Sequence, residues 1–142
     1  MFELFGKVNF SPCTKVSEFA GHLKDGRLMG SKCKRCGHES FPPKADCNIC
    51  LSDEFDYVEF SGKATLLSHT KIYAAPTGFE DDVPYRIGVV DLEETGRLLA
   101  WFGDSIEDDE IKIGMKLQVL PQMSGDEPDA RVYYSLEQPG TK

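Results

Sequence analysis

The spacing of apolar residues changes along the chain and separates a short N-terminal part from a longer part with strand periodicity. Near the N-terminus, Phe19 and Leu23 share one face of a predicted helix over residues 17–24. Ser17 is the candidate N-cap, and Asp25-Gly26 is the expected stop. Residues 1–16 have no strong periodicity and are interpreted as an arm.

From residue 56 onward, apolar and polar positions alternate with a period of two, which is typical of strands. The expected strands are 57–60 running through Ser61-Gly62 into 64–73, with a bulge at the glycine, then 85–92, 97–102, 116–120 and 131–136. An acidic helical turn over 106–111 separates the third and fourth barrel strands. Five strands with this insertion predict an OB-fold, a five-stranded Greek-key barrel.

Four cysteines lie between the helix and the strands, as Cys33-Lys34-Arg35-Cys36 and Cys47-Asn48-Ile49-Cys50. Two Cys-x-x-Cys pairs at this spacing can place four thiolates around one metal ion in tetrahedral geometry. Short strands at 27–32 and 39–41 would join the two turns as a rubredoxin-like zinc ribbon. We therefore predict a mainly β protein, with the helix and ribbon in residues 1–54 and the OB-fold in 55–142.

Other interpretations of the cysteines are weaker. Two disulfides would need an oxidising compartment, and the first seven residues lack a basic leader and an apolar run, which favours a cytoplasmic protein. Zinc is favoured over iron because zinc ribbons are the commoner Cys₄ sites. A closed Cys₄ site is structural, since it leaves no open coordination position. Cys13 lies outside the cluster and is interpreted as a reduced, inert thiol, with a catalytic nucleophile as the alternative.

The net charge of −8 is unevenly distributed over the 142 residues. Residues 1–50 hold 8 basic and 5 acidic residues, a net charge of +3, whereas residues 51–142 hold 8 basic and 19 acidic residues, a net charge of −11. The acidic part should repel a nucleic-acid backbone, while the basic part could meet a phosphorylated small molecule. No apolar run approaches the length of a transmembrane helix, so no membrane partner is expected.

Several segments in order along the chain resemble the zinc-ribbon/OB-fold family of acyl-CoA-associated proteins. They are residues 26–37, Phe41-Pro42-Pro43, the second cysteine pair, residues 60–65, 75–79, 89–93, 96–99 and 113–115. The resemblance covers roughly residues 17–137. It implies an accessory subunit that pairs with thiolases, hydroxymethylglutaryl-CoA-synthase-like enzymes, acyl-CoA hydratases or side-chain aldolases, which supply the catalytic residues. One departure is that the family often has Cys-Pro-x-Cys-Gly at the second turn, where this chain has Asn48 and Leu51.

The predicted function is therefore a non-catalytic subunit that binds a thiolase-like enzyme and helps to hold the CoA thioester. The alternatives are a nucleic-acid-binding zinc-ribbon/OB-fold module and an independent enzyme using Cys13. Candidate acyl-CoA contacts are the basic ribbon residues Lys34 and Arg35 for the phosphates, and Tyr73, Pro76 and Phe79 for the apolar part. Phe41 and Tyr85 could line the same channel or a partner face, although packing in the core or a loop is the simpler interpretation. The three histidines are assigned surface or structural roles, and Asp108-Asp109-Glu110 a solvated helix face.

Overall fold

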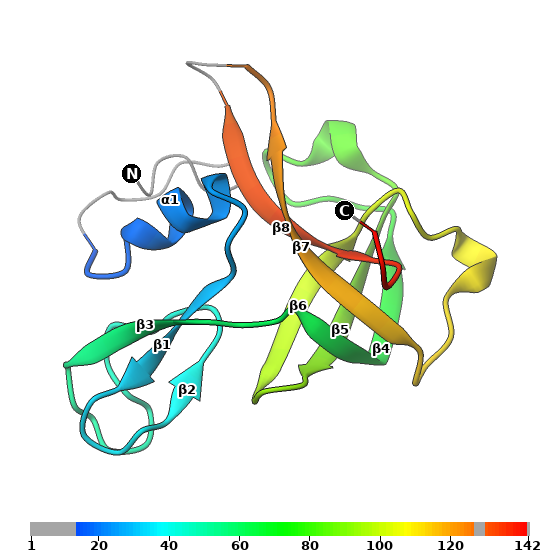
Figure 1. Cartoon of the computed structure of the whole chain (residues 1–142). Helices are drawn as coiled ribbons and strands as arrows, with labels where there is room; N and C mark the ends of the chain where they lie inside the picture. Colours follow the sequence, from blue (N-terminus) through cyan, green and yellow to red (C-terminus); the bar gives the residue numbers. More distant parts are fainter. Residues whose placement is uncertain (1–13, 127–129, 142) are drawn as a thin grey trace.

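The computed structural model describes residues 14–126 and 130–141, which form a small β-sheet unit and a barrel (Figure 1). The elements, in chain order, are α1 (Glu18–Lys24), β1 (Met29–Cys33), β2 (Glu39–Ser40), β3 (Phe55–Glu59), β4 (Lys63–Ile72), the 3₁₀ turn η2 (Glu80–Asp82), β5 (Tyr85–Leu92), β6 (Arg97–Phe102), the 3₁₀ turn η3 (Asp108–Glu110), β7 (Lys116–Ser124) and β8 (Arg131–Glu137). Within these residues, no helix is both long and apolar enough to span a bilayer.

The ribbon is a three-stranded antiparallel sheet in the order β2-β1-β3. β1 pairs with β3 over its whole length, from Met29 opposite Glu59 to Cys33 opposite Phe55. The prediction of one long strand from residue 57 to residue 73 is therefore wrong. β3 belongs to the ribbon sheet, and a separate strand, β4, begins the barrel at Lys63.

Gly62 explains why the chain breaks between β3 and β4. Its φ is +81°, and a Cβ atom at this position would lie 2.5 Å from the carbonyl oxygen of Val119. The Gly62 carbonyl also accepts a hydrogen bond of 2.7 Å from the Val119 N–H. The glycine is thus the point where the chain passes closely over β7 and enters the barrel. The β-bulge expected here lies instead between Leu66 and Ser68.

The barrel closes in the order β4-β5-β6-β8-β7, with β7 returning to β4. All neighbouring strands are antiparallel except β6 and β8, which pair in parallel through Trp101 opposite Ser135. The five-stranded barrel and the turn η3 between β6 and β7 confirm the predicted OB-like fold. The barrel core is apolar, with Leu66, Val90, Val119 and Leu136 fully buried.

Helix α1 rests on the barrel hairpin β7–β8 and on β1. Phe19, Ala20 and Leu23 are its buried residues, as the i, i+4 spacing of the first and last predicted. Ser17 occupies the predicted N-cap position, but it has helical dihedrals and its side chain makes no capping hydrogen bond to the helix. The helix ends as expected at residues 25–26, where Gly26 has a φ of +77°.

A cluster of aromatic rings joins helix, ribbon and barrel. The Phe41 ring of the ribbon lies 5.7 Å from that of Phe19 in α1, 5.5 Å from that of Phe60 before β4, and 5.6 Å from that of Tyr134 in β8. Phe41 is 5% exposed, so it belongs to the core and does not line a surface channel. The ribbon has little core of its own, so it is stabilised by packing Phe41 against the helix and the barrel.

Candidate metal centre

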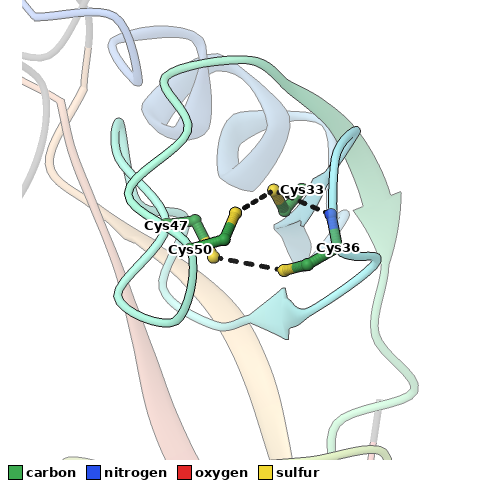
Figure 2. A group of neighbouring side chains, drawn as sticks. All are labelled: Cys33, Cys36, Cys47 and Cys50. Atoms are coloured by element: carbon green, nitrogen blue, oxygen red, sulfur yellow. Dashed lines mark hydrogen bonds between the residues drawn. The ribbon is translucent and has the colours of Figure 1, made fainter.

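The four cysteines of the ribbon converge on one point, as predicted from their spacing. Cys33 is the last residue of β1, Cys36 lies in the turn that follows, and Cys47 and Cys50 lie in the second turn (Figure 2). Their four Sγ atoms all lie within 4.8 Å of one another. No other group of three or more ligand side chains meets this criterion in the described residues.

The sulfur separations fit a tetrahedral zinc ion. Cys33 Sγ lies 3.5 Å from Cys50 Sγ, and Cys36 Sγ lies 3.5 Å from Cys47 Sγ. A zinc–sulfur bond of about 2.3 Å in tetrahedral geometry requires sulfur separations of about 3.8 Å. These two separations are a few tenths of an ångström shorter than that value, and all four sulfurs are close enough together to share one metal ion. Since four thiolates complete the coordination, the metal would be structural.

The two cysteine turns have the same backbone design. In the first, the Cys33 N–H donates to the His38 carbonyl at 2.9 Å and the Gly37 N–H to the Cys33 carbonyl at 3.0 Å. In the second, the Cys47 N–H donates to the Ser52 carbonyl at 2.9 Å and the Leu51 N–H to the Cys47 carbonyl at 3.0 Å. Gly37 and Leu51 are equivalent, and both have positive φ, +79° and +64°. The second turn therefore keeps the shape that glycine favours, although a leucine occupies the position.

Backbone N–H donors and neighbouring sulfurs shift the pKa values of the cysteine thiols in different directions. The N–H of Cys36, 3.5 Å from Cys33 Sγ, is the main cause that lowers the pKa of Cys33 to about 6. The N–H groups of Cys50 and Ile49 lower the pKa of Cys47. The N–H of His38 acts in the same sense on Cys36, but desolvation and the adjacent sulfurs together raise the pKa of Cys36 to about 12. Four thiolates this close need a cation, because their charges repel.

The same two units are recognised in comparisons with known proteins. Residues 20–56 match the rubredoxin-like zinc ribbon domain of ChsH2, and residues 57–120 match the C-terminal OB-fold domain of ChsH2. A DUF35 domain-containing scaffold protein of Pyrococcus furiosus is 37% identical over 107 residues, which are 75% of this chain and 77% of that protein. The chain belongs to the ChsH2 family of DUF35 proteins.

Relatives in the ChsH2 family include subunits of enzymes. The benzoylsuccinyl-CoA thiolase subunit BbsA of Thauera aromatica is 35% identical over 79 residues, 54% of each chain. The solved Ltp2-ChsH2(DUF35) aldolase contains a chain that superposes with a TM-score of 0.69 at 25% identity, covering 94% of this chain and 98% of that one. The zinc ribbon of the ChsH2 family, together with the clustered sulfurs, supports structural zinc in this member.

The predicted phosphate contacts lie on the ribbon of this ChsH2-family chain. Lys34 and Arg35 occupy the first cysteine turn and are exposed. The Lys34 ammonium lies 3.6 Å from the carboxylate of Asp56, while both side chains stay more than half exposed. At such exposure the pairing is weak, so the ammonium remains able to exchange partners.

The predicted apolar contacts lie on the loop between β4 and β5, at the top of Figure 1 and at the opposite end of the molecule from the ribbon at lower left. Tyr73 is 71% exposed. Pro76 begins a turn in which its carbonyl accepts a 3.1 Å hydrogen bond from the Phe79 N–H, and the Phe79 ring lies 5.9 Å from that of Trp101. The structure therefore places all three residues on one loop, away from Lys34 and Arg35.

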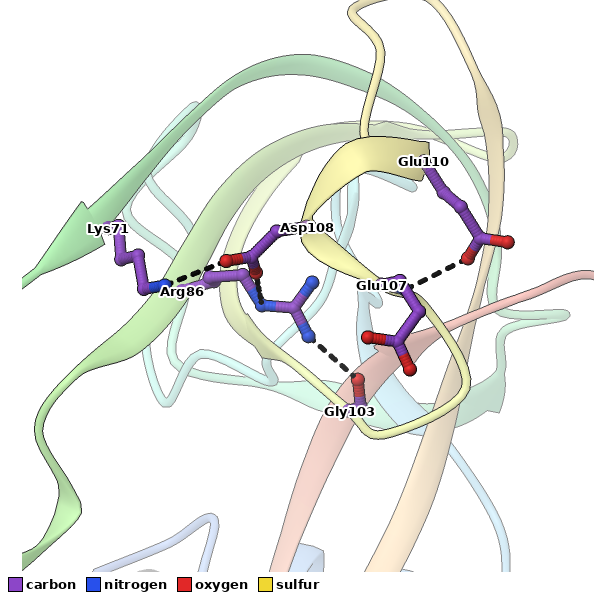
Figure 3. A network of polar contacts seen from close by, with 6 residues as sticks. All are labelled: Lys71, Arg86, Gly103, Glu107, Asp108 and Glu110. Carbon is purple, nitrogen blue, oxygen red and sulfur yellow. Dashed lines mark hydrogen bonds and ion pairs between the residues drawn. The ribbon is translucent and has the colours of Figure 1, made fainter.

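Reasoning from the sequence missed a charged network at one end of the barrel (Figure 3). Asp108 of η3 accepts contacts from Lys71 Nζ at 2.7 Å and from Arg86 Nε at 3.1 Å. A hydrogen bond from Lys71 lowers the pKa of Asp108, and the same bond raises the pKa of Lys71. Asp108 is thus paired, unlike the solvated carboxylate expected. No local sequence pattern indicated this network, because Lys71 and Arg86 become neighbours only through the β4–β5 register.

Proposed function

We propose that this chain is an accessory subunit of an acyl-CoA enzyme of the thiolase class, without a reaction of its own. It would bind the catalytic subunit and help to hold the CoA thioester while the partner makes or breaks a carbon–carbon bond. The observation that carries the proposal is the relationship to BbsA, a thiolase subunit, and to a chain of the Ltp2-ChsH2(DUF35) aldolase. The saturated cysteine site adds that its metal serves the fold and leaves no position for a substrate.

The proposed contribution to catalysis is positioning. A wall that orients the thioester and excludes water can lower the barrier without supplying a reacting group. Lys34 and Arg35 would bind CoA phosphates, since a guanidinium and an ammonium are the usual donors to phosphate oxygens. Tyr73, Pro76 and Phe79 would line the path of the apolar part.

Because the ribbon and the β4–β5 loop lie at opposite ends of the molecule, these two contacts are independent and need separate tests. Charge reversal by Lys34→Glu or Arg35→Glu should weaken acyl-CoA binding by the assembled complex, with zinc content unchanged. Lys44→Glu is the matched control, because Lys44 is also an exposed ribbon lysine outside the first cysteine turn. Tyr73→Ala tests the loop in the same assay.

The experiment is co-expression with a thiolase-like subunit encoded in the same transcription unit. Isothermal titration of the purified complex with acyl-CoA, beside steady-state kinetics, then measures affinity and turnover. We expect a stable hetero-oligomer, no turnover by this chain alone, and a KM that rises in the contact variants. A catalytic subunit with unchanged kcat and KM in the absence of this chain would contradict the proposal. If all variant complexes bind acyl-CoA with equal affinity, the CoA contact does not involve these residues.

A further inference from the structure

The outer surface of the barrel is apolar along most of two adjacent strands. In β5, the inward residues Gly88, Val90 and Leu92 are buried, so the alternate residues face outward. Antiparallel strands with one face on a core normally carry polar residues on the other face. Here most outward positions of β5 and β6 are apolar, and we call them the β5–β6 outer face: Tyr85, Ile87, Val89, Leu99 and Trp101. The last outward pair is charged, because Arg97 lies opposite Asp91 and its Nε is 2.9 Å from the Asp91 carboxylate.

These side chains form one continuous strip. The strand register places Ile87 opposite Trp101 and Val89 opposite Leu99. The Tyr85 ring stacks on the Trp101 ring at a centroid distance of 4.1 Å and an interplanar angle of 14°. Leu99 remains 58% exposed. The α-helix of the described residues does not shield the strip, because it packs on β7, β8 and β1.

Carboxylates predominate at both ends of the strip, since the one basic residue of its outward positions, Arg97, is already paired with Asp91. Glu80 and Asp81 of η2 lie just before Tyr85, and Glu93 and Glu94 follow directly after β5. The four side chains belong to exposed residues. An eight-residue strand is about 26 Å long at about 3.3 Å per residue. A complementary surface would therefore carry an apolar patch with basic groups about 25–30 Å apart on either side of it.

OB-folds bind oligonucleotides on the face of their second and third strands, which are β5 and β6 in this barrel. Nucleic acid is therefore the competing ligand. Two observations disfavour it. The acidic ends would repel phosphates, whereas single-strand-binding faces need a positive groove. The rings of Tyr85 and Trp101 also cover one another, so each has already lost one of the two faces on which a base could stack.

We infer that the β5–β6 outer face is the docking surface for the catalytic acyl-CoA enzyme subunit, which meets it with an apolar patch flanked by basic side chains. The inference rests on the proposed function and adds which surface of this chain would contact the catalytic subunit. Burial of a central leucine and tryptophan would supply the affinity, and the acidic ends would orient the partner and speed its association.

The test compares Leu99→Glu with Met123→Glu in complexes with the co-expressed thiolase-like subunit. The two residues form a matched pair, because both lie in strands and are 58% and 57% exposed, yet Met123 lies on β7, outside the face. Leu99→Glu should weaken the complex at least about tenfold and Met123→Glu less than about threefold. Thermal unfolding and zinc content of the free chains establish that both variants are folded.

The possible outcomes separate the inference from the proposed function. If the wild-type chain forms no complex, the proposed function fails and the inference falls with it. If the wild-type complex forms and Leu99→Glu leaves it intact, or if both variants weaken it equally, only the inference is overturned. Two further results would overturn it: a wild-type homodimer that Leu99→Glu dissociates, and quenching of Trp101, the sole tryptophan, by single-stranded oligothymidylate at low salt.

Discussion

Leu51 offers the sharpest test of how the metal centre is built. It is the only non-glycine residue of the described chain with positive φ, and it directly follows the last cysteine. Its side chain is 81% exposed, so packing does not account for the conformation. Gly37 takes the equivalent position in the first turn. We predict that Leu51→Gly relieves strain that the second turn now carries in its metal-bound form.

The magnitude follows from a comparison with Ile49→Gly in the same turn. A left-handed conformation costs an ordinary residue about 1–2 kcal/mol. Ordering a glycine costs about 0.5–1 kcal/mol more than ordering an alanine, and both variants carry this cost. Ile49 is also exposed, at 64%, but its φ is not positive, so its replacement relieves nothing. The difference between the two variants should therefore equal the strain, about 1–2 kcal/mol or roughly 5- to 30-fold in an equilibrium constant.

Competition for zinc with a chromophoric chelator measures this difference. Folding of a small zinc ribbon is coupled to metal binding, so strain in the bound turn lowers the apparent zinc affinity. Leu51→Gly should hold zinc roughly 5- to 30-fold more tightly than Ile49→Gly and slightly more tightly than the wild type. Leu51→Asn should also exceed Ile49→Gly, because asparagine adopts positive φ more readily than other side chains.

Equal zinc affinities of the two glycine variants would refute the reasoning. They would mean that the second turn relaxes at little cost, or that leucine is not strained there. A stabilised Leu51→Gly chain that binds its partner more weakly would have a different meaning. It would show that the exposed Leu51 side chain contacts the partner, and that the turn is strained because a leucine is needed there.

Two other predictions concern the metal and the pH dependence of stability. Replacing Cys33 by Ser should lower the zinc content from one per chain toward zero and unfold the ribbon, as elemental analysis and NMR spectra would record; full zinc content in the variant would contradict the Cys₄ site. Burial raises the pKa of Tyr134 to about 12. The unfolded chain loses this proton near pH 10, so stability should be full below about pH 10 and fall toward pH 12. Tyr134→Phe should reduce that fall in urea unfolding measured between pH 9 and 11, and an unchanged slope would contradict it.

Local patterns predicted the elements whose signals are local. The bounds of β5 and β6 agree with the predicted 85–92 and 97–102, because both strands are strongly apolar and meet at a short turn ending in Gly96. The cysteine site was predictable since ligand identity and spacing are local as well. Cys13, by contrast, lies outside the described residues.

Features set by long-range register could not be predicted. Apolar and polar residues alternate through residues 57–73, so no local pattern indicated that β3 pairs with β1 while β4 enters the barrel. The close approach of Gly62 to Val119 decides this, and it joins residues far apart in the sequence. The pairing of Asp108 with Lys71 and Arg86 has the same origin. Alternation also identified β5 without showing that its outward residues are apolar enough to form a surface.

The way each half is stabilised suggests why docking would fall on the barrel. The barrel pairs all five strands into a closed sheet around a buried apolar core, so the position of the β5–β6 outer face does not depend on the metal. The ribbon depends on four sulfurs and on Phe41, which packs against Phe60 and Tyr134. A subunit that positions a thioester must hold its partner rigidly, and the closed barrel provides the stiffer base. The aromatic cluster around Phe41 then fixes the ribbon to that base, so Lys34 and Arg35 would be presented at a defined place relative to the docked partner.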